Sequence, residues 1–248
     1  MIDLASADYI RQRLEPKPGD PLYLHLSDLL LAIKDLIPRG VGPVLDFGCG
    51  GSPYRPLFGP RTYHRADLAG SGAALDFEYG VDSLLSAPSE DYACVLSSQV
   101  LEHVCSPLAY LAECRRVLRP GGQLFLSTHG LFEDHACPYD FWRWTVFGLQ
   151  RMVEEAGFTI EKIKKLTTGP RAAVFLAERV FGEHGQRANF NRAGLYSRCV
   201  HHGTRVVRKV GARRRHAACD TSFPQHRMAD LGQEGHDMYI AIALLAHR

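Results

Sequence analysis

The sequence lacks several features that would place it in a specialised class of protein. It has no CxxC pair, and its seven cysteines are an odd number without short paired spacings, which excludes a secreted disulfide framework and a ribbon-type zinc site. No apolar run reaches roughly 18 to 20 residues, and the first twenty residues lack the basic segment and apolar run of a signal peptide. We therefore expect a cytoplasmic protein with reduced thiols and no membrane span.

The chain as a whole also has little charge of one sign. Twenty-nine Lys and Arg against 27 Asp and Glu give +2, which excludes a strongly basic nucleic-acid binder. Residues 181–220 differ, because nine basic and two acidic residues give +7 there, whereas the other 20 basic and 25 acidic residues give −5. This segment is interpreted as a solvated, flexible insertion. Its basic residues are Arg187, Arg192, Arg198, Arg205, Arg208, Lys209, Arg213, Arg214 and Arg215.

The length of 248 residues and the 46% of hydrophobic residues indicate a folded domain with a large core. Apolar residues three and four apart predict a helix over 21–37. Further helices are predicted from Pro107 and from Val146, and strands over 43–47, 62–67, 73–77, 92–97, 123–127, 158–166 and 237–247. Strands that alternate with helices predict an α/β fold with a mostly parallel sheet, whose ligands bind beyond the carboxyl ends of the strands.

A glycine-rich turn follows the first strand, in the sequence VLDFGCGG at 44–51. Glycines let a ligand approach the backbone and its amides closely, which favours a nucleotide-like cofactor. A dinucleotide fingerprint would need glycine where Pro53 stands. The carboxylate of Asp46 would repel a pyrophosphate but attract an ammonium or sulfonium group. The turn therefore favours S-adenosylmethionine over a dinucleotide.

The chain resembles the class I S-adenosylmethionine-dependent methyltransferases, and within them the type 11 group. The resemblance rests on VLDFGCG at 44–50, on Asp67, on VLEHV at 100–104 and on RVLRPGG followed by QLFLS at 116–127, in the family's order. It implies a Rossmann-like sheet with an antiparallel last strand and helices on both faces. It also implies S-adenosyl-L-methionine as cofactor, bound by Asp46, Phe47, Gly48, Gly50, Asp67, Leu68, Asp76, Phe77 and Gln99.

Transfer of a methyl group to a hydroxyl needs a base, and histidine can accept a proton near neutral pH. His129 follows the fifth strand and His103 the fourth, so both are candidate catalytic residues; packing or capping is the alternative role for each. His129, His135 and Cys137 match no common zinc spacing, so no metal site is predicted.

An aromatic and charged segment, 135–145, has the composition of a substrate lid rather than of a simple connection. Together with GSPYR at 51–55, this segment is similar to a bacterial branch of the family found near glycan or secondary-metabolite assembly. Packing of the tryptophans and an Asp140–Arg143 pair are the alternative. The candidate substrate-binding residues are Tyr54, Arg55, His135, Tyr139, Asp140, Trp142 and Arg143.

The predicted organisation is an N-terminal helical cap (1–40), a cofactor-binding core (41–180), a basic insertion (181–235) and a final core strand (236–248). The predicted function is O-methylation of a small-molecule or glycan-related hydroxyl. Two alternatives stay open: an RNA methyltransferase that binds nucleic acid through residues 181–220, and a non-catalytic, cofactor-binding partner subunit. The sequence does not determine the oligomeric state.

Overall fold

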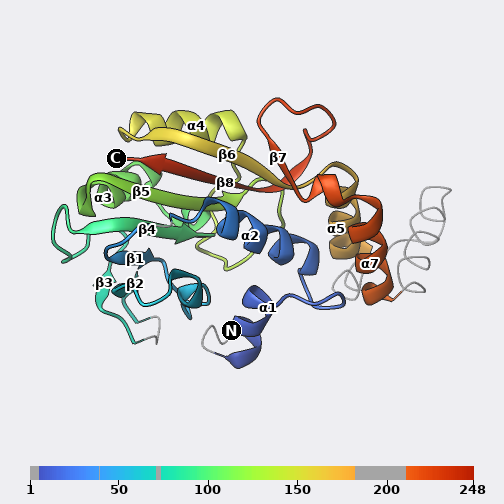
Figure 1. The fold of residues 1–248 in the computed structure, drawn as a ribbon, viewed down its shortest axis with the longest axis horizontal. Helices are drawn as coiled ribbons and strands as arrows, with labels where there is room; N and C mark the ends of the chain where they lie inside the picture. Colours follow the sequence, from blue (N-terminus) through green and yellow to red (C-terminus); the bar gives the residue numbers. More distant parts are fainter. Residues whose placement is uncertain (1–5, 39, 71–73, 182–210) are drawn as a thin grey trace.

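The computed structural model describes residues 6–38, 40–70, 74–181 and 211–248 (Figure 1). Within them, eight strands form one sheet in the order β3-β2-β1-β4-β5-β8-β6-β7. Strands β1 to β5 are parallel, and β8 is antiparallel to both β5 and β6, which confirms the predicted fold class. The strands are β1 (Val44–Phe47), β2 (Tyr63–Leu68), β3 (Phe77–Tyr79), β4 (Tyr92–Ser98), β5 (Leu118–His129), β6 (Thr159–Thr168), β7 (Met228–Asp230) and β8 (Tyr239–His247).

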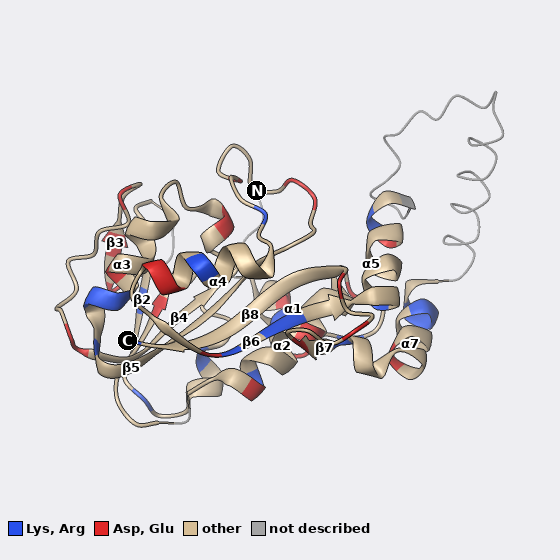
Figure 2. Ribbon diagram, turned by 90° about the horizontal axis from the view of Figure 1, so that it is seen from above, with Lys and Arg blue, Asp and Glu red and all other residues tan. Residues whose placement is uncertain are grey.

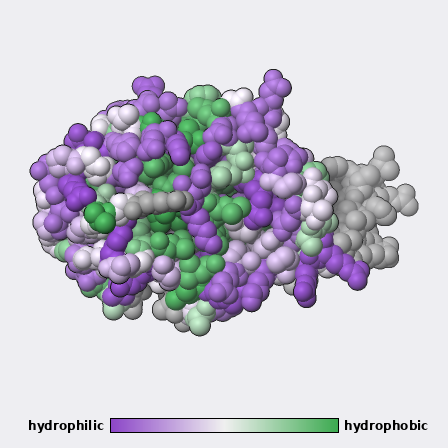
Figure 3. All heavy atoms as spheres, in the orientation of Figure 1, coloured by the Kyte–Doolittle hydropathy of each residue, from purple (hydrophilic) through white to green (hydrophobic). Residues whose placement is uncertain are grey.

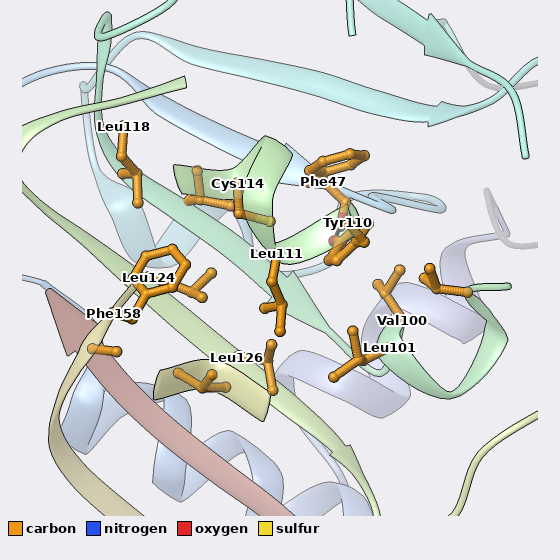
Figure 4. Close-up of a cluster of buried hydrophobic side chains, with 14 of the residues drawn as sticks. Phe47, Val100, Leu101, Tyr110, Leu111, Cys114, Leu118, Leu124, Leu126 and Phe158 are labelled. Carbon is orange, nitrogen blue, oxygen red and sulfur yellow. Dashed lines mark hydrogen bonds between the residues drawn. The ribbon is translucent and has the colours of Figure 1, made fainter. Parts of the chain in front are cut away.

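Helices cover both faces of this sheet (Figure 1). Side chains of α3 and α4 pack into one cluster with β1, β4 and β5, drawn in part in Figure 4. On the other face α2 packs with β1, β4, β5 and β8. The helical elements are α1 (Ala7–Leu14), α2 (Tyr23–Leu36), η1 (Arg55–Phe58), η2 (Leu101–His103), α3 (Pro107–Val117), α4 (Val146–Glu155), α5 (Gly169–Phe181), α7 (Ala212–Ser222) and η4 (Pro224–His226).

Local sequence signals explain where several of these elements begin and end. The spacing of apolar residues in α2 gives a face that is almost fully buried, as predicted. The Thr145 side chain accepts a hydrogen bond from the Gly148 N–H and caps α4, while Gly157, with φ of +86°, follows its end. Ser106 occupies the N-cap position of α3, but its side chain makes no capping hydrogen bond.

Two predicted strands have different bounds in the structure. The third strand begins at Phe77 and not at Ala73, so Asp76 precedes it. The fifth begins at Leu118, because the Arg119–Gly122 segment continues into β5 after α3 ends.

The sequence did not reveal the elements between β6 and β8. Helix α5 packs with α2 and α7 around Phe175, and β7 pairs with β6 at the edge of the sheet. The predicted flexible insertion therefore includes an ordered helix and strand, since the short β7 and the polar α7 carry weak patterns. Its basic residues from Arg187 to Lys209 lie outside the described residues. Likewise, the predicted N-terminal cap includes α2, which lies directly on the sheet.

The surface mixes both signs of charge. Basic and acidic residues alternate over the helices in Figure 2, with a basic cluster (Arg213, Arg214 and Arg215) at the start of α7. Apolar residues form a band across the face in Figure 3, over α2. Among the described helices, none has the length and apolar character needed to cross a membrane. The described cysteines are all free thiols, and Cys49, Cys94, Cys114 and Cys219 are buried.

Candidate functional site

The glycine turn lies at the carboxyl end of β1, where the strand order reverses between β2 and β4. Gly48 has φ of +81°, and a Cβ atom there would lie 2.5 Å from Val100 Cγ2. Its N–H and that of Cys49 both donate to the Ala66 carbonyl, at 2.8 and 3.0 Å. The expectation that these amides are exposed to a ligand is thus wrong for these two. Glycine is needed at 48 for close packing and backbone shape.

Two carboxylates flank this turn. Asp67, near the end of β2, accepts hydrogen bonds from the N–H groups of Gly50 and Leu68, both at 2.7 Å. Burial raises the pKa of Asp67, and these N–H groups oppose the rise. Asp46 is only 4% exposed and accepts from the Tyr63 hydroxyl at 2.7 Å. Burial raises the pKa of Asp46 to about 7, although the hydrogen bond from Tyr63 opposes the rise. None of the ion pairs among the described residues includes Asp46.

Other predicted cofactor residues lie at different depths. Asp76 and Phe77 stand at the amino end of β3, and the Asp76 carboxylate accepts from the Arg65 N–H at 2.8 Å. In the parallel register Asp67 pairs with Glu78, so Asp76 and Phe77 lie further from the carboxyl end of the sheet than Asp67 does. The acidic residue just beyond the carboxyl end of β3 is Asp82, which is exposed.

Three more predicted residues complete this edge. Leu68 ends β2 and is 41% exposed, so its apolar side chain is available to a ligand. Gln99 follows β4 with φ of +58°, and its amide donates to the Ser127 hydroxyl at 3.2 Å. The Phe47 ring is fully buried against Tyr79 and Tyr110, so only its backbone can border the turn (Figure 4).

The two predicted bases belong to a cluster of imidazole rings. His129 ends β5 and His103 ends η2; the His135 ring lies 5.0 Å from the first and 4.7 Å from the second, between centroids. From α2, His25 adds a fourth ring 5.2 Å from His129. Burial holds the pKa of His129 well below its ordinary value, and the neighbouring His25, His135 and Arg143 lower it further, so the ring is neutral.

Glu102 lies within this cluster and carries a buried carboxylate. Its Oε2 accepts from the Thr128 hydroxyl at 2.8 Å, whereas Oε1 has no hydrogen-bond partner and lies 3.3 Å from His129 Nε2. Burial raises the pKa of Glu102 to about 7. The sequence analysis missed Glu102 and His25. The position of Glu102 beside His103, after a predicted strand, was the available signal; His25 had none, because the apolar spacing explains its helix.

The predicted lid is fastened to the body of the protein. Asp140 and Arg143 form a bidentate ion pair with both N–O distances 2.7 Å, which lowers the pKa of Asp140 to about 2. The Trp142 indole donates to the Val104 carbonyl at 2.8 Å and its ring stacks on Trp144. These contacts match the alternative interpretation, in which the tryptophans pack and Asp140 pairs with Arg143. Tyr139 remains 56% exposed.

The two remaining substrate candidates lie on the other side of the turn. The Tyr54 side chain is buried beneath α2, in the cluster around Leu29 and Phe58. Arg55 lines a cavity of about 390 Å³ together with Gly51, Ser52, Tyr63, Arg65 and Asp76. Of the predicted substrate residues, the structure thus groups His135, Tyr139, Asp140, Trp142 and Arg143 in one loop and sets Tyr54 and Arg55 apart.

Comparison with curated proteins finds relatives along part of the chain. A ubiquinone biosynthesis O-methyltransferase of Cereibacter sphaeroides strain KD131 is 38% identical over 99 residues, which cover 34% of this chain and 40% of the relative. A protein of the same name from Xylella fastidiosa strain 9a5c is 29% identical over 126 residues, or 45% of this chain and 51% of the relative. The chain thus spans about 40 to 51% of the length of these relatives.

Solved structures share the fold over most of the chain. The cyclase SpnF matches with a TM-score of 0.55 at 17% identity, covering 93% of this chain and 83% of that one. An S-adenosylmethionine-dependent methyltransferase from Mesorhizobium loti matches with a TM-score of 0.53 at 16% identity, covering 91% of this chain and all of that one. Since one of these two is named as a cyclase, the fold alone does not assign the reaction.

The sequence also matches a family model described as a methyltransferase domain, over residues 22–163. The match runs from α2 into β6 and includes the glycine turn, Asp46, Asp67 and the loop of residues 130–145. The chain therefore belongs to the methyltransferase domain family and has the sheet of the class I S-adenosylmethionine-dependent methyltransferases.

Proposed function

We propose that this chain binds S-adenosylmethionine at the carboxyl edge of β1, β2 and β4 and transfers its methyl group to a hydroxyl of a small molecule. The buried Asp46 carboxylate carries the first half of the proposal. A carboxylate without a paired cation, beside a glycine turn, is matched to a ligand whose amino-acid end bears an ammonium group.

Asp67 would hold the ribose hydroxyls. The Asp67 carboxylate accepts hydrogen bonds from two backbone N–H groups, those of Gly50 and Leu68. Because a carboxylate has about four acceptor sites, it can still accept hydrogen bonds from a diol. Leu68, the residue after Asp67, offers an exposed apolar surface for the adenine ring. Asp82, which is exposed just beyond the carboxyl end of β3, would contact the adenine amino group, because Asp76 and Phe77 lie at the amino end of that strand.

The second half rests on the histidines and on the relatives. When bound, the cofactor supplies an electrophilic methyl group on a sulfonium; the acceptor oxygen forms the new C–O bond, and the C–S bond breaks. The acceptor's proton must pass to a base of this chain. His129 and His103 lie at the same end of the sheet, and burial keeps His129 unprotonated, the state in which an imidazole can accept a proton. Relatives named O-methyltransferases support oxygen as the acceptor atom.

Calorimetric titration with S-adenosylhomocysteine tests the cofactor site. We expect binding by the wild type, and a loss of at least about tenfold for Asp67→Ala, because two or more hydrogen bonds to a charged group are removed. Asp91→Ala is the control, since this acid lies before β4, at the opposite edge of the sheet. Absence of binding by the folded wild type would overturn the proposal.

Methyl transfer from labelled cofactor to a panel of hydroxyl compounds tests the reaction. For an accepted compound, His129→Ala should lower kcat by about a hundredfold or more, the usual contribution of a general base, and leave cofactor binding intact. His247→Ala, a histidine paired with Glu161 at the far end of β8, should have no effect. Full turnover by both His129→Ala and His103→Ala would show that neither is the base.

A further inference from the structure

We propose that Glu102, His103 and His135 bind one divalent transition-metal ion at the entrance of the active site. Their ligand atoms all lie within 4.8 Å of one another. Two imidazole nitrogens and one carboxylate oxygen form a donor set suited to zinc and neighbouring first-row ions. Ligands on one tetrahedral zinc ion lie about 3.3 Å apart, so small side-chain rotations suffice to close the site.

The unpartnered oxygen of Glu102 is the second observation that points to a cation. The side chain is fully buried, Oε2 is satisfied by Thr128, and Oε1 faces the cluster without a hydrogen-bond partner. Although His129 Nε2 is 3.3 Å away, the contact lacks hydrogen-bond geometry. A buried, unsatisfied carboxylate oxygen is costly, and an ion coordinated there would remove the cost.

The two histidines are already oriented for coordination. His103 Nδ1 lies 2.6 Å from the Tyr139 carbonyl, and His135 Nδ1 lies 3.2 Å from the Glu133 carbonyl and 3.5 Å from the Asp140 carboxylate. An Nδ1–H group that donates to an oxygen leaves Nε2 unprotonated, which is the usual arrangement of a metal-binding histidine. In both residues the nitrogen that remains available is therefore Nε2.

The loop contacts explain why the site needs the whole fold. The Phe141 and Trp142 N–H groups donate to the Glu102 carbonyl, and the Asp140–Arg143 pair also binds the His135 N–H. These bonds hold the loop over η2. Because His103 and His135 are only partly buried, the fourth position of a tetrahedral ion would stay open on the outer side.

A metal ion at this site would take part in the proposed methyl transfer, and its catalytic role therefore depends on the proposed function. Its open position would bind the acceptor's hydroxyl oxygen and lower the pKa of that hydroxyl. Val100, two residues before Glu102, packs against Gly48, so the proposed metal site lies next to the glycine turn. With His103 as a ligand, His129 would be the remaining base.

Metal titration of chelator-treated protein tests the site, with Zn²⁺ in the calorimeter and Co²⁺ in visible absorption. We expect one equivalent to bind, and His135→Ala and His103→Ala each to weaken binding by at least about tenfold. His247→Ala is the matched control, because its imidazole also pairs with a glutamate but lacks a third ligand. Glu102→Gln, which keeps the side-chain volume, should also weaken binding.

The outcomes separate this inference from the proposed function. Metal-free protein should still bind S-adenosylhomocysteine, because none of the three ligands belongs to the glycine turn. Failure of that binding alone would refute the cofactor proposal but leave the metal site standing. No stoichiometric Zn²⁺ binding, or binding that is unchanged in His103→Ala and His135→Ala, would overturn the metal site.

Discussion

Replacement of Gly48 by alanine should cost far more stability than an ordinary glycine substitution. The backbone at Gly48 has φ of +81°, a conformation that side-chain-bearing residues avoid. An added Cβ would also lie 2.5 and 2.7 Å from the two methyl carbons of Val100, where carbon contacts are usually about 3.5 to 4.0 Å. Val100 belongs to the buried cluster that includes Phe47 and Leu101, so a shift of its side chain would disturb the packing of this core (Figure 4).

The two effects can be given separate magnitudes. The left-handed backbone costs about 1–2 kcal/mol for alanine, and overpacking of a filled core costs about 1–3 kcal/mol. Gly48→Ala should thus lower the free energy of unfolding by about 2–5 kcal/mol. Gly232→Ala is the matched control: its φ is +82°, but no atom lies within 4 Å of the added Cβ, so only the backbone cost applies.

Urea unfolding of both variants measures this difference. A double variant that combines Gly48→Ala with Val100→Ala should recover the overpacking part, about 1–3 kcal/mol, as a favourable coupling energy in a double-mutant cycle. S-adenosylhomocysteine binding by Gly48→Ala should weaken as well, since the turn must shift. Equal destabilisation by Gly48→Ala and Gly232→Ala, with no coupling to Val100, would refute the reasoning.

Two further predictions concern buried charges. Burial raises the pKa of Asp46 to about 7 in the folded state, so ionisation of this side chain destabilises the wild type as the pH rises from about 4 to 7. Over this window, the free energy of unfolding of Asp46→Asn should rise relative to that of the wild type by roughly 3–4 kcal/mol. A difference in urea unfolding that does not change with pH would contradict this prediction. Arg171 is fully buried and binds Asp28 and Asp220, so Arg171→Met should cost about 3–5 kcal/mol, whereas Lys164→Met at a surface pair should cost less than about 1 kcal/mol. Equal losses in these two variants would show that Arg171 is not required to balance the buried acids.

The local sequence was sufficient to locate the elements of the proposed cofactor site. Strand β1, the glycine turn and Asp67 follow from short patterns, because a buried parallel strand is a continuous apolar run and a tight turn needs glycine. The order of strands and helices likewise determined the class of sheet. The bounds of the third strand were predicted wrongly because it has only three residues, Phe77–Tyr79, too few for a pattern. Asp76, the predicted adenine contact, consequently precedes the strand.

The use of charged residues in the loop could not be read from composition. Asp140 and Arg143 look like substrate-binding groups in the sequence, yet the structure pairs them with each other. Spacing allows either outcome, since residues three apart meet only when the loop bends suitably. The region beyond β6 was similarly ambiguous: α7 is polar along most of its length and packs through His216 and Cys219, which gives little periodic signal.

The sequence by itself determined the family, the sheet and the acids beside the turn, because each depends on residues close together in the chain. Only the tertiary structure decided the grouping of Glu102, His103, His129 and His135, since it brings together η2, β5 and the following loop. It also showed that α2 contributes His25 to the same cluster, from 104 positions before His129. Contacts over such separations depend on how the sheet and its helices pack, and no local pattern encodes that packing.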